Sequence, residues 1–391
     1  MTNFQPYSTL RSLSTRPPGS PGQWPAVLML LTALASGCAP HLGDSEAALA
    51  LEDISTGVLP SRLKAETPHP ARRTVAYEID GRSHKGDFYI SPEGASAGIV
   101  VVPGVVPAGK NDRRLVSLAK TLARLRFAVL IPDIEGLRHY RVRMSDVREV
   151  ADAFRHLKSR PELQLHDSVG IAGFSYGAGP VLLAALEPSI QDTVEFVVVL
   201  GGYYDLRTIV TYFTTGYYRD TSESEWRRRD PNPYALQVFT ISNSDLLDRP
   251  TDRAALGRYA RETHDGDVID SATTPTNLAP DAQAFFALLT NKDPNRVPML
   301  INGLSPRIRS ELAGIDPASH DLSRYRADVI IVHGRNDNII PFTESVALAR
   351  ALPNNKAYLH LIDGFAHVDM GLERNDIPRM LRVMEQVLEY R

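Results

Sequence analysis

The residues best suited to chemistry in this sequence lie in GFSYG, residues 173–177, where Ser175 stands between Gly173 and Gly177. The apolar run SVGIAGF before the serine is typical of a buried strand, and GAGPVLLAALE after it is typical of a helix. A serine on a turn between strand and helix has its hydroxyl exposed at the carboxyl edge of a sheet, and glycines leave room for that turn. The motif therefore predicts a nucleophile; the alternative is a packing serine.

A serine hydroxyl needs a base to remove its proton, and the base is usually a histidine oriented by a carboxylate. Downstream of Ser175, the apolar run VIIVHG is followed by Asp337, and the run YLHLI is followed by His367. The carboxyl ends of parallel strands meet at one edge of a sheet, so both side chains are expected near the serine. We predict His367 as the base and Asp337 as the acid.

Other residues compete for these roles. His333 ends its own strand and is expected to point into the following loop, whereas His360 lies inside the last strand. Asp205 and Asp363 are the alternative acids, and Asp337 stands in GRNDN, where aspartate and asparagine also serve as turn formers.

Two backbone N–H groups are needed to stabilise the oxyanion of an acyl-transfer transition state. One donor is expected at Tyr176, directly after the nucleophile. The other is expected in the loop of VVPGVV, where Gly104 allows the backbone to turn and Val105 is the candidate donor. The alternative for this loop is a plain Pro-Gly turn.

Apolar strand-like runs alternate with helical patterns over residues 72–205 and again over 326–391. This alternation predicts an α/β fold with a mostly parallel central sheet and helices on both faces. The interval 206–325 is too long for a loop and is predicted to be a helical cap inserted between late strands. Aromatic pairs at 203–204, 212–213, 217–218 and 285–286 either line an apolar substrate site or form the core of the cap.

From about residue 72 the chain resembles the α/β-hydrolases with a helical cap. The resemblance is carried, in order, by VVPGVV, AVLIPDIEGLR, GFSYGAG, HGRNDNIIP and GFAHVD. Within IPDIEG, the residues Asp133 and Gly136 are interpreted as structural parts of the site's rim. The chain departs from the family's pattern at Pro103, where many members have histidine.

The resemblance implies a serine hydrolase with a Ser-His-Asp triad and an acyl-enzyme, without metal or organic cofactor. Its partner would be a small-molecule acyl substrate: a carboxylic ester is expected first, and an amide or thioester next. An acyltransferase of the same fold and a non-catalytic, lipid-anchored binding protein are the alternatives.

The N-terminal region resembles a bacterial lipoprotein signal. Residues 1–37 combine arginines with the apolar stretch WPAVLMLLTALAS, and LASGC resembles a lipobox that ends at Cys38. We predict a signal peptide over 1–37, lipidation of Cys38 and a tether over 38–71. Ala39 favours export to the periplasmic side of an outer membrane. An ordinary cleaved signal, an uncleaved anchor and a buried thiol are the alternatives.

Composition narrows the remaining functions. The chain has 391 residues, a formal net charge of -3 and one cysteine. One cysteine permits neither an internal disulfide nor a cysteine-based zinc site. Near-neutral charge without a basic stripe or recognition motif gives no case for nucleic-acid binding. The sequence specifies no oligomeric state.

Overall fold

The computed structural model describes residues 43–391 except 164–167, 265–274, 368 and 371–373. The predicted signal peptide and Cys38 therefore lie outside the described residues.

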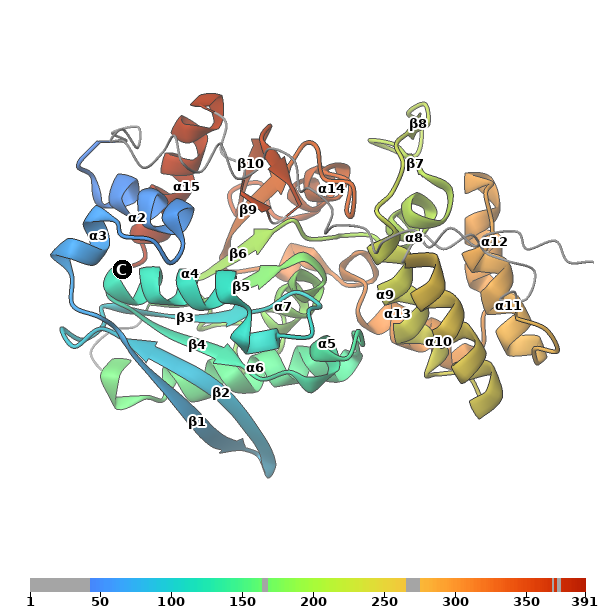
Figure 1. The fold of residues 1–391 in the computed structure, drawn as a ribbon, viewed down its shortest axis with the longest axis horizontal. Coiled ribbons are helices and arrows are strands. Elements are labelled where there is room, and N and C mark those ends of the chain that lie inside the picture. The colour runs from blue at the N-terminus through green and yellow to red at the C-terminus, as the bar shows by residue number, and fades with distance from the viewer. Residues whose placement is uncertain (1–42, 164–167, 265–274, 368, 371–373) are drawn as a thin grey trace, which may run out of the picture. The chain divides into compact units, whose positions relative to one another are not determined.

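A twisted sheet forms the centre of the described chain (Figure 1). Its strands occur in the order β1-β2-β4-β3-β5-β6-β9-β10, and β2 runs antiparallel to both of its neighbours. From β4 to β10 all neighbouring strands are parallel. The strands are β1 (Ala71–Ile79), β2 (Arg82–Ile90), β3 (Ala97–Val102), β4 (Phe127–Pro132), β5 (Val169–Phe174), β6 (Phe196–Leu200), β9 (Asp328–Gly334) and β10 (Ala357–Ile362).

The sequence of each strand matches its place in the sheet. Every residue of β3 and β4 is buried, as expected for parallel strands covered on both faces. At the edge, β1 and β2 form a hairpin whose two-residue turn, Asp80-Gly81, has positive φ at both positions. The backbone twist of such a turn matches the twist of the paired strands, and Asp-Gly suits it because both residues tolerate positive φ.

Helices cover both faces of the sheet (Figure 1): α4 and α15 lie on one face, and α6 and α7 on the other. The predicted mostly parallel sheet between helical layers is confirmed. The helices around the sheet are α2 (Glu46–Thr56), α3 (Arg62–Glu66), α4 (Arg113–Arg124), α5 (Glu135–Arg138), α6 (Met144–Lys158), α7 (Ala178–Ala184), α14 (Thr343–Ala351) and α15 (Ile377–Leu388).

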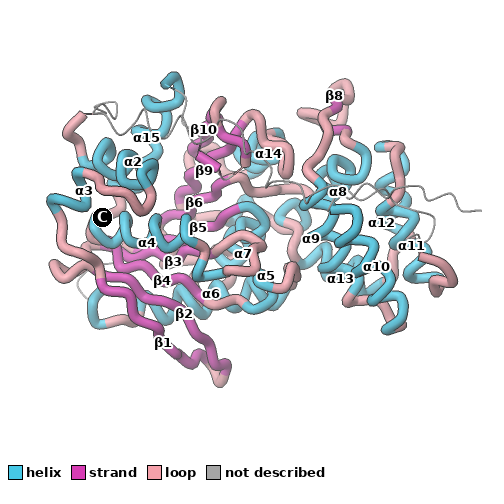
Figure 2. The backbone as a smooth tube through the Cα atoms, in the orientation of Figure 1, coloured by secondary structure: helices cyan, strands magenta, loops and turns pink. Residues whose placement is uncertain are grey.

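The residues between β6 and β9 form a separate group of helices (Figure 2). Several of these helices begin with proline in the first turn, where its missing N–H is not needed. The group contains α8 (Leu206–Thr215), α9 (Pro233–Ser244), α10 (Pro250–His264), α11 (Pro280–Leu289), α12 (Val297–Asn302), α13 (Pro306–Gly314) and the hairpin of β7 (Tyr217–Tyr218) and β8 (Arg227–Arg228).

The prediction of a tether over 38–71 is wrong for the part that contains α2 and α3. Helix α2 packs against α4 and α15, and Asp53 on α2 is buried. The Asp53 carboxylate accepts a hydrogen bond from Thr121 of α4 at 2.6 Å and pairs with Lys64 at 2.5 Å. Alanine, serine and proline are common in linkers, and their abundance in this segment favoured that interpretation. Small alanine side chains also let helices pack closely, and this is their role in α2.

A buried carboxylate joins the sheet domain to the first cap helix. Glu344, on α14, accepts hydrogen bonds from the N–H groups of Tyr204 and Asp205 at 3.0 and 2.8 Å and from the Thr208 hydroxyl. Burial raises the pKa of Glu344 to about 7, with a smaller contribution from the Asp205 charge and an opposing one from its hydrogen bonds. Near neutral pH this group therefore retains a proton that the unfolded chain has already lost.

We expect Glu344→Gln to change how stability depends on pH. A raised pKa means that the folded protein binds the extra proton, so its stability falls as pH rises from about 5 to about 7. The glutamine variant lacks this titration and should gain up to about 3 kcal/mol relative to wild type over that interval. Chemical unfolding of both proteins at several pH values measures the difference; a difference that stays constant would contradict the assignment.

Candidate active site

Ser175 lies on the turn at the carboxyl end of β5. It opens a single 3-10 turn, Ser175–Gly177, that leads directly into α7. Its φ of 52° is in the left-handed region, which is unfavourable for a residue with a side chain. Such strain persists only where the surroundings hold it, and here it turns the hydroxyl out of the strand at the sheet edge.

The glycines of the motif are required by close packing around this turn. A Cβ on Gly173 would lie 2.9 Å from the Ala178 Cα, and a Cβ on Gly177 would collide with the carbonyl of Pro103. Protein Cβ atoms do not approach backbone that closely, so both positions need glycine. The loop after β3 is thereby packed directly against the turn that carries Ser175.

His367 lies within hydrogen-bonding distance of both predicted partners. Its Nε2 is 2.8 Å from Ser175 Oγ, and its Nδ1 is 2.7 Å from Asp337 Oδ2. Like Ser175, it has positive φ, 61°. The structure thus brings Ser175, His367 and Asp337 into one chain of hydrogen bonds, although 192 positions separate the serine from the histidine.

Asp337 is surrounded by donors. Its Oδ1 accepts from the N–H groups of Ile339 and Ile340 at 2.8 and 2.9 Å, while its Oδ2 faces His367 and, at 3.3 Å, the Nε2 of His333. Burial opposes ionisation, but the hydrogen bonds from the two histidines outweigh it and hold the pKa of Asp337 well below its ordinary value. The carboxylate is therefore charged and fixed in orientation.

His333 faces the loop that follows β9, as expected, but it does so from a buried position beside Asp337. Its ring is fully buried, with Nδ1 2.6 Å from the Ser345 hydroxyl and Nε2 2.9 Å from the carbonyl of Ile340. A carbonyl only accepts, so Nε2 carries the proton, which is also directed toward Asp337. The sequence signal for this role is the position of His333, four residues before Asp337 and at the end of β9.

The other competing residues have partners elsewhere. His360 Nε2 contacts Gln386 at 2.8 Å on the outer strand β10. Asp205 caps α8 by accepting from the N–H of Arg207 at 2.8 Å. Asp363 forms ion pairs with Arg335 and Arg379, at 3.1 and 3.0 Å.

The two predicted oxyanion donors belong to two segments that adjoin the nucleophile. Tyr176 follows Ser175 in the turn, and Val105 lines the cavity in front of it. The Val105 carbonyl accepts a hydrogen bond from the hydroxyl of Tyr234, on cap helix α9. The cap thus fixes the peptide that follows Val105, and no local sequence pattern predicts this contact.

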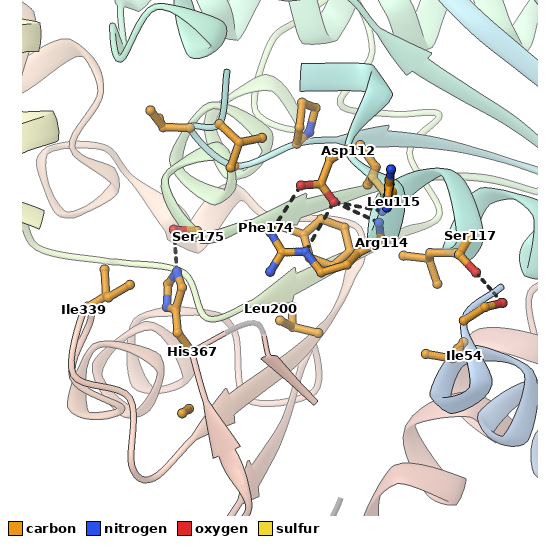
Figure 3. A pocket seen from close by; sticks show the side chains of 18 of the residues that line it. Ile54, Asp112, Arg114, Leu115, Ser117, Phe174, Ser175, Leu200, Ile339 and His367 are labelled. Carbon is orange, nitrogen blue, oxygen red and sulfur yellow. Dashed lines mark hydrogen bonds and ion pairs between the residues drawn. The ribbon is translucent and has the colours of Figure 1, made fainter. Parts of the chain in front are cut away.

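A cavity of about 860 Å³ opens at Ser175 (Figure 3). Ser175 and His367 lie at one end, Ile54 and Ser117 lie at the other, and Phe174, Leu200 and Leu115 lie between them (Figure 3). The lining residues come from α2 and the turn after it, the loop after β3, the start of α4, the ends of β5 and β6, the loops around Asn338 and Ala366, and cap residues Asn232 and Tyr234.

The structure favours the second interpretation of the cap aromatics. None of the aromatic pairs singled out in the sequence lines this cavity. Phe213 and Phe285 instead pack on Phe239 within the cap, with ring centroids 4.9 and 5.7 Å apart. The cap aromatic that does reach the cavity is Tyr234.

The described residues show neither a metal-binding cluster nor a membrane-spanning helix. They contain no cluster of three or more His, Cys, Asp or Glu side chains that could hold a metal ion. No helix among them is long and apolar enough to cross a membrane.

The strand order with its reversed second strand, and the serine on the turn after β5, define the α/β-hydrolase fold. A scan against protein-family models finds no match, and a search of the curated proteins finds none either.

Solved structures with a similar chain include a dienelactone hydrolase from Anabaena variabilis, with 16% identity over 83% of this chain and 97% of that chain and a TM-score of 0.43. Est1E from Butyrivibrio proteoclasticus has 15% identity over 81% of this chain and 98% of that chain, with a TM-score of 0.43. An acylaminoacyl peptidase from Pyrococcus horikoshii has 11% identity over 83% of this chain and 42% of that chain, with a TM-score of 0.46.

Proposed function

We propose that this protein is a serine hydrolase that cleaves carboxylic esters through an acyl-enzyme. The observation that carries the proposal is the chain of hydrogen bonds from Ser175 Oγ through His367 to Asp337. A hydroxyl within 2.8 Å of an imidazole, itself oriented by a buried carboxylate, is the arrangement that activates serine for attack.

The chemistry follows from these contacts. Ser175 Oγ adds to the ester carbonyl carbon while its proton moves to His367 Nε2. The bond to the alcohol oxygen then breaks as Nε2 returns that proton to the leaving alcohol. Water repeats the sequence on the acyl-enzyme: His367 takes a proton from water, the resulting hydroxide adds to the acyl carbon, and Ser175 leaves reprotonated. Asp337 holds the Nδ1–H tautomer and stabilises the imidazolium in both halves.

The N–H groups of Val105 and Tyr176 are assigned to the developing oxyanion. Proline at 103 supplies no side-chain donor, so the loop acts through its backbone, and its position is supported by Gly177 and by the Tyr234 hydroxyl. Donors that are fixed before reaction need no reorganisation when negative charge develops.

We also propose that the enzyme is exported and anchored by a lipid on Cys38. Support comes from the arginine-containing start, the apolar stretch and the LASGC motif. Because α2 begins at Glu46 and packs on the core, such an anchor would hold the enzyme close to the membrane.

A fluorophosphonate probe tests the proposal, because only an activated serine is phosphonylated. We expect wild type to be labelled and to hydrolyse p-nitrophenyl esters faster than matched amides and thioesters. Added alcohols or amines separate hydrolysis from acyl transfer: capture of most of the acyl group would favour the acyltransferase. A folded wild type that reacts with neither probe nor esters would exclude both enzymes and favour the binding protein.

A further inference from the structure

The N-terminal segment that was expected to be a tether forms the end of the active-site cavity remote from His367 (Figure 3). The last turn of α2 and the residues after it supply Ile54, Ser55, Gly57 and Val58 to the lining. Ser117 on α4 donates a hydrogen bond to the carbonyl of Gly57 at 3.0 Å, which holds this turn against the helix. The segment is thus part of the site rather than a neighbour of it.

The lining between Ser175 and this segment is largely apolar. Phe174, Leu200 and Leu115 lie between the nucleophile and Ile54 (Figure 3), and Leu118 of α4 also lines the cavity. The charged residues of the lining are Asp112, Arg113 and Arg114. The charged groups of Asp112 and Arg114 are 3.2 Å apart and partly neutralise each other. A lining of this kind favours hydrocarbon, and its volume is that of a pocket for a ligand of drug size.

The position of the catalytic groups decides which part of an ester enters this space. His367 must deliver a proton to the leaving alcohol, so the alcohol lies at the His367 end. The carbonyl oxygen points to the loop that contains Val105. The acyl group is then left with the part of the cavity that runs along α4, where the distance from the N-cap residue Asp112 to Leu118 is about 9 Å.

We propose that the segment from Ile54 to Val58 is the specificity element for medium-chain acyl groups, whose distal carbons it contacts. This inference rests on the proposed esterase function and adds the substrate class to it. Val58, which is 82% exposed without substrate, covers the end of such a chain. A long acyl group buries the Val58 side chain and gains binding free energy from this contact, whereas a short acyl group does not reach it.

Val58→Asp in the full-length protein tests this assignment, with Leu59→Asp as its matched control. The two neighbours are both exposed and apolar, at 82% and 58%, but only Val58 lines the cavity. For p-nitrophenyl decanoate we expect Val58→Asp to lower kcat/KM about tenfold relative to p-nitrophenyl acetate, since one apolar contact in a pocket changes discrimination by about this factor. Leu59→Asp should leave the ratio unchanged.

A second variant, Ile54→Ala, should lower the same decanoate-to-acetate ratio through lost apolar contact. Equal losses for both esters in Val58→Asp, or an equal change in Leu59→Asp, would overturn the inference while leaving esterase activity in place. A wild type that hydrolyses neither ester would overturn the proposed function and the inference with it.

Discussion

Ser175→Ala is expected to lower kcat for the best ester by about five to six orders of magnitude, the loss seen when the nucleophile of a coupled triad is removed. The variant keeps the turn but lacks the oxygen that His367 contacts at 2.8 Å. Turnover of p-nitrophenyl esters by extensively purified protein measures the loss, and fluorophosphonate labelling should vanish with it.

The Ser175→Ala variant should remain folded, because the change removes one oxygen from a residue whose strain comes from its backbone. Its thermal unfolding is therefore expected to stay close to that of wild type or to rise slightly. A folded variant that retains more than a small fraction of wild-type turnover would exclude Ser175 as the nucleophile.

Asp337→Asn is expected to lower kcat by about four orders of magnitude, as when the carboxylate of a triad becomes an amide. The asparagine oxygen would keep the two N–H groups of Ile339 and Ile340, so its NH₂ would face His367. An amide NH₂ donates to Nδ1 and so stabilises the tautomer with its proton on Nε2, which is unable to accept the proton of Ser175. Steady-state ester turnover measures the effect.

Asp363→Asn is the matched control for Asp337→Asn. Asp363 also follows a late strand, but its carboxylate pairs with Arg335 and Arg379. Within the described part of the chain, it makes no hydrogen bond or ion pair with His367. Partly exposed ion pairs contribute little, so this variant should keep activity within about twofold of wild type. If Asp363→Asn lost as much activity as Asp337→Asn, the acid would have to be reassigned.

Much of this site could be predicted because strand ends are predictable. Ser175, Asp337 and His367 each follow an apolar run, and parallel strands bring their carboxyl ends to one edge of the sheet. Local periodicity therefore placed three distant residues in one region before any contact was known. It did not place His333, because a fully buried imidazole beside the acid depends on the path of the following loop.

By itself, then, the sequence determined the alternation of strands and helices, the turn that carries the nucleophile and the candidate triad, all of which depend on local pattern and on chain order. Only the tertiary structure decided what surrounds Ser175. The end of α2 and the turn at Val58 form part of the cavity wall, and the Tyr234 hydroxyl fixes the Val105 loop. The tertiary structure also decided that cap aromatics such as Phe213 and Phe239 pack against each other. The physical reason is that a cavity wall consists of surfaces from segments far apart in the chain, and an apolar side chain has the same local pattern whether it packs against a neighbour or faces a substrate.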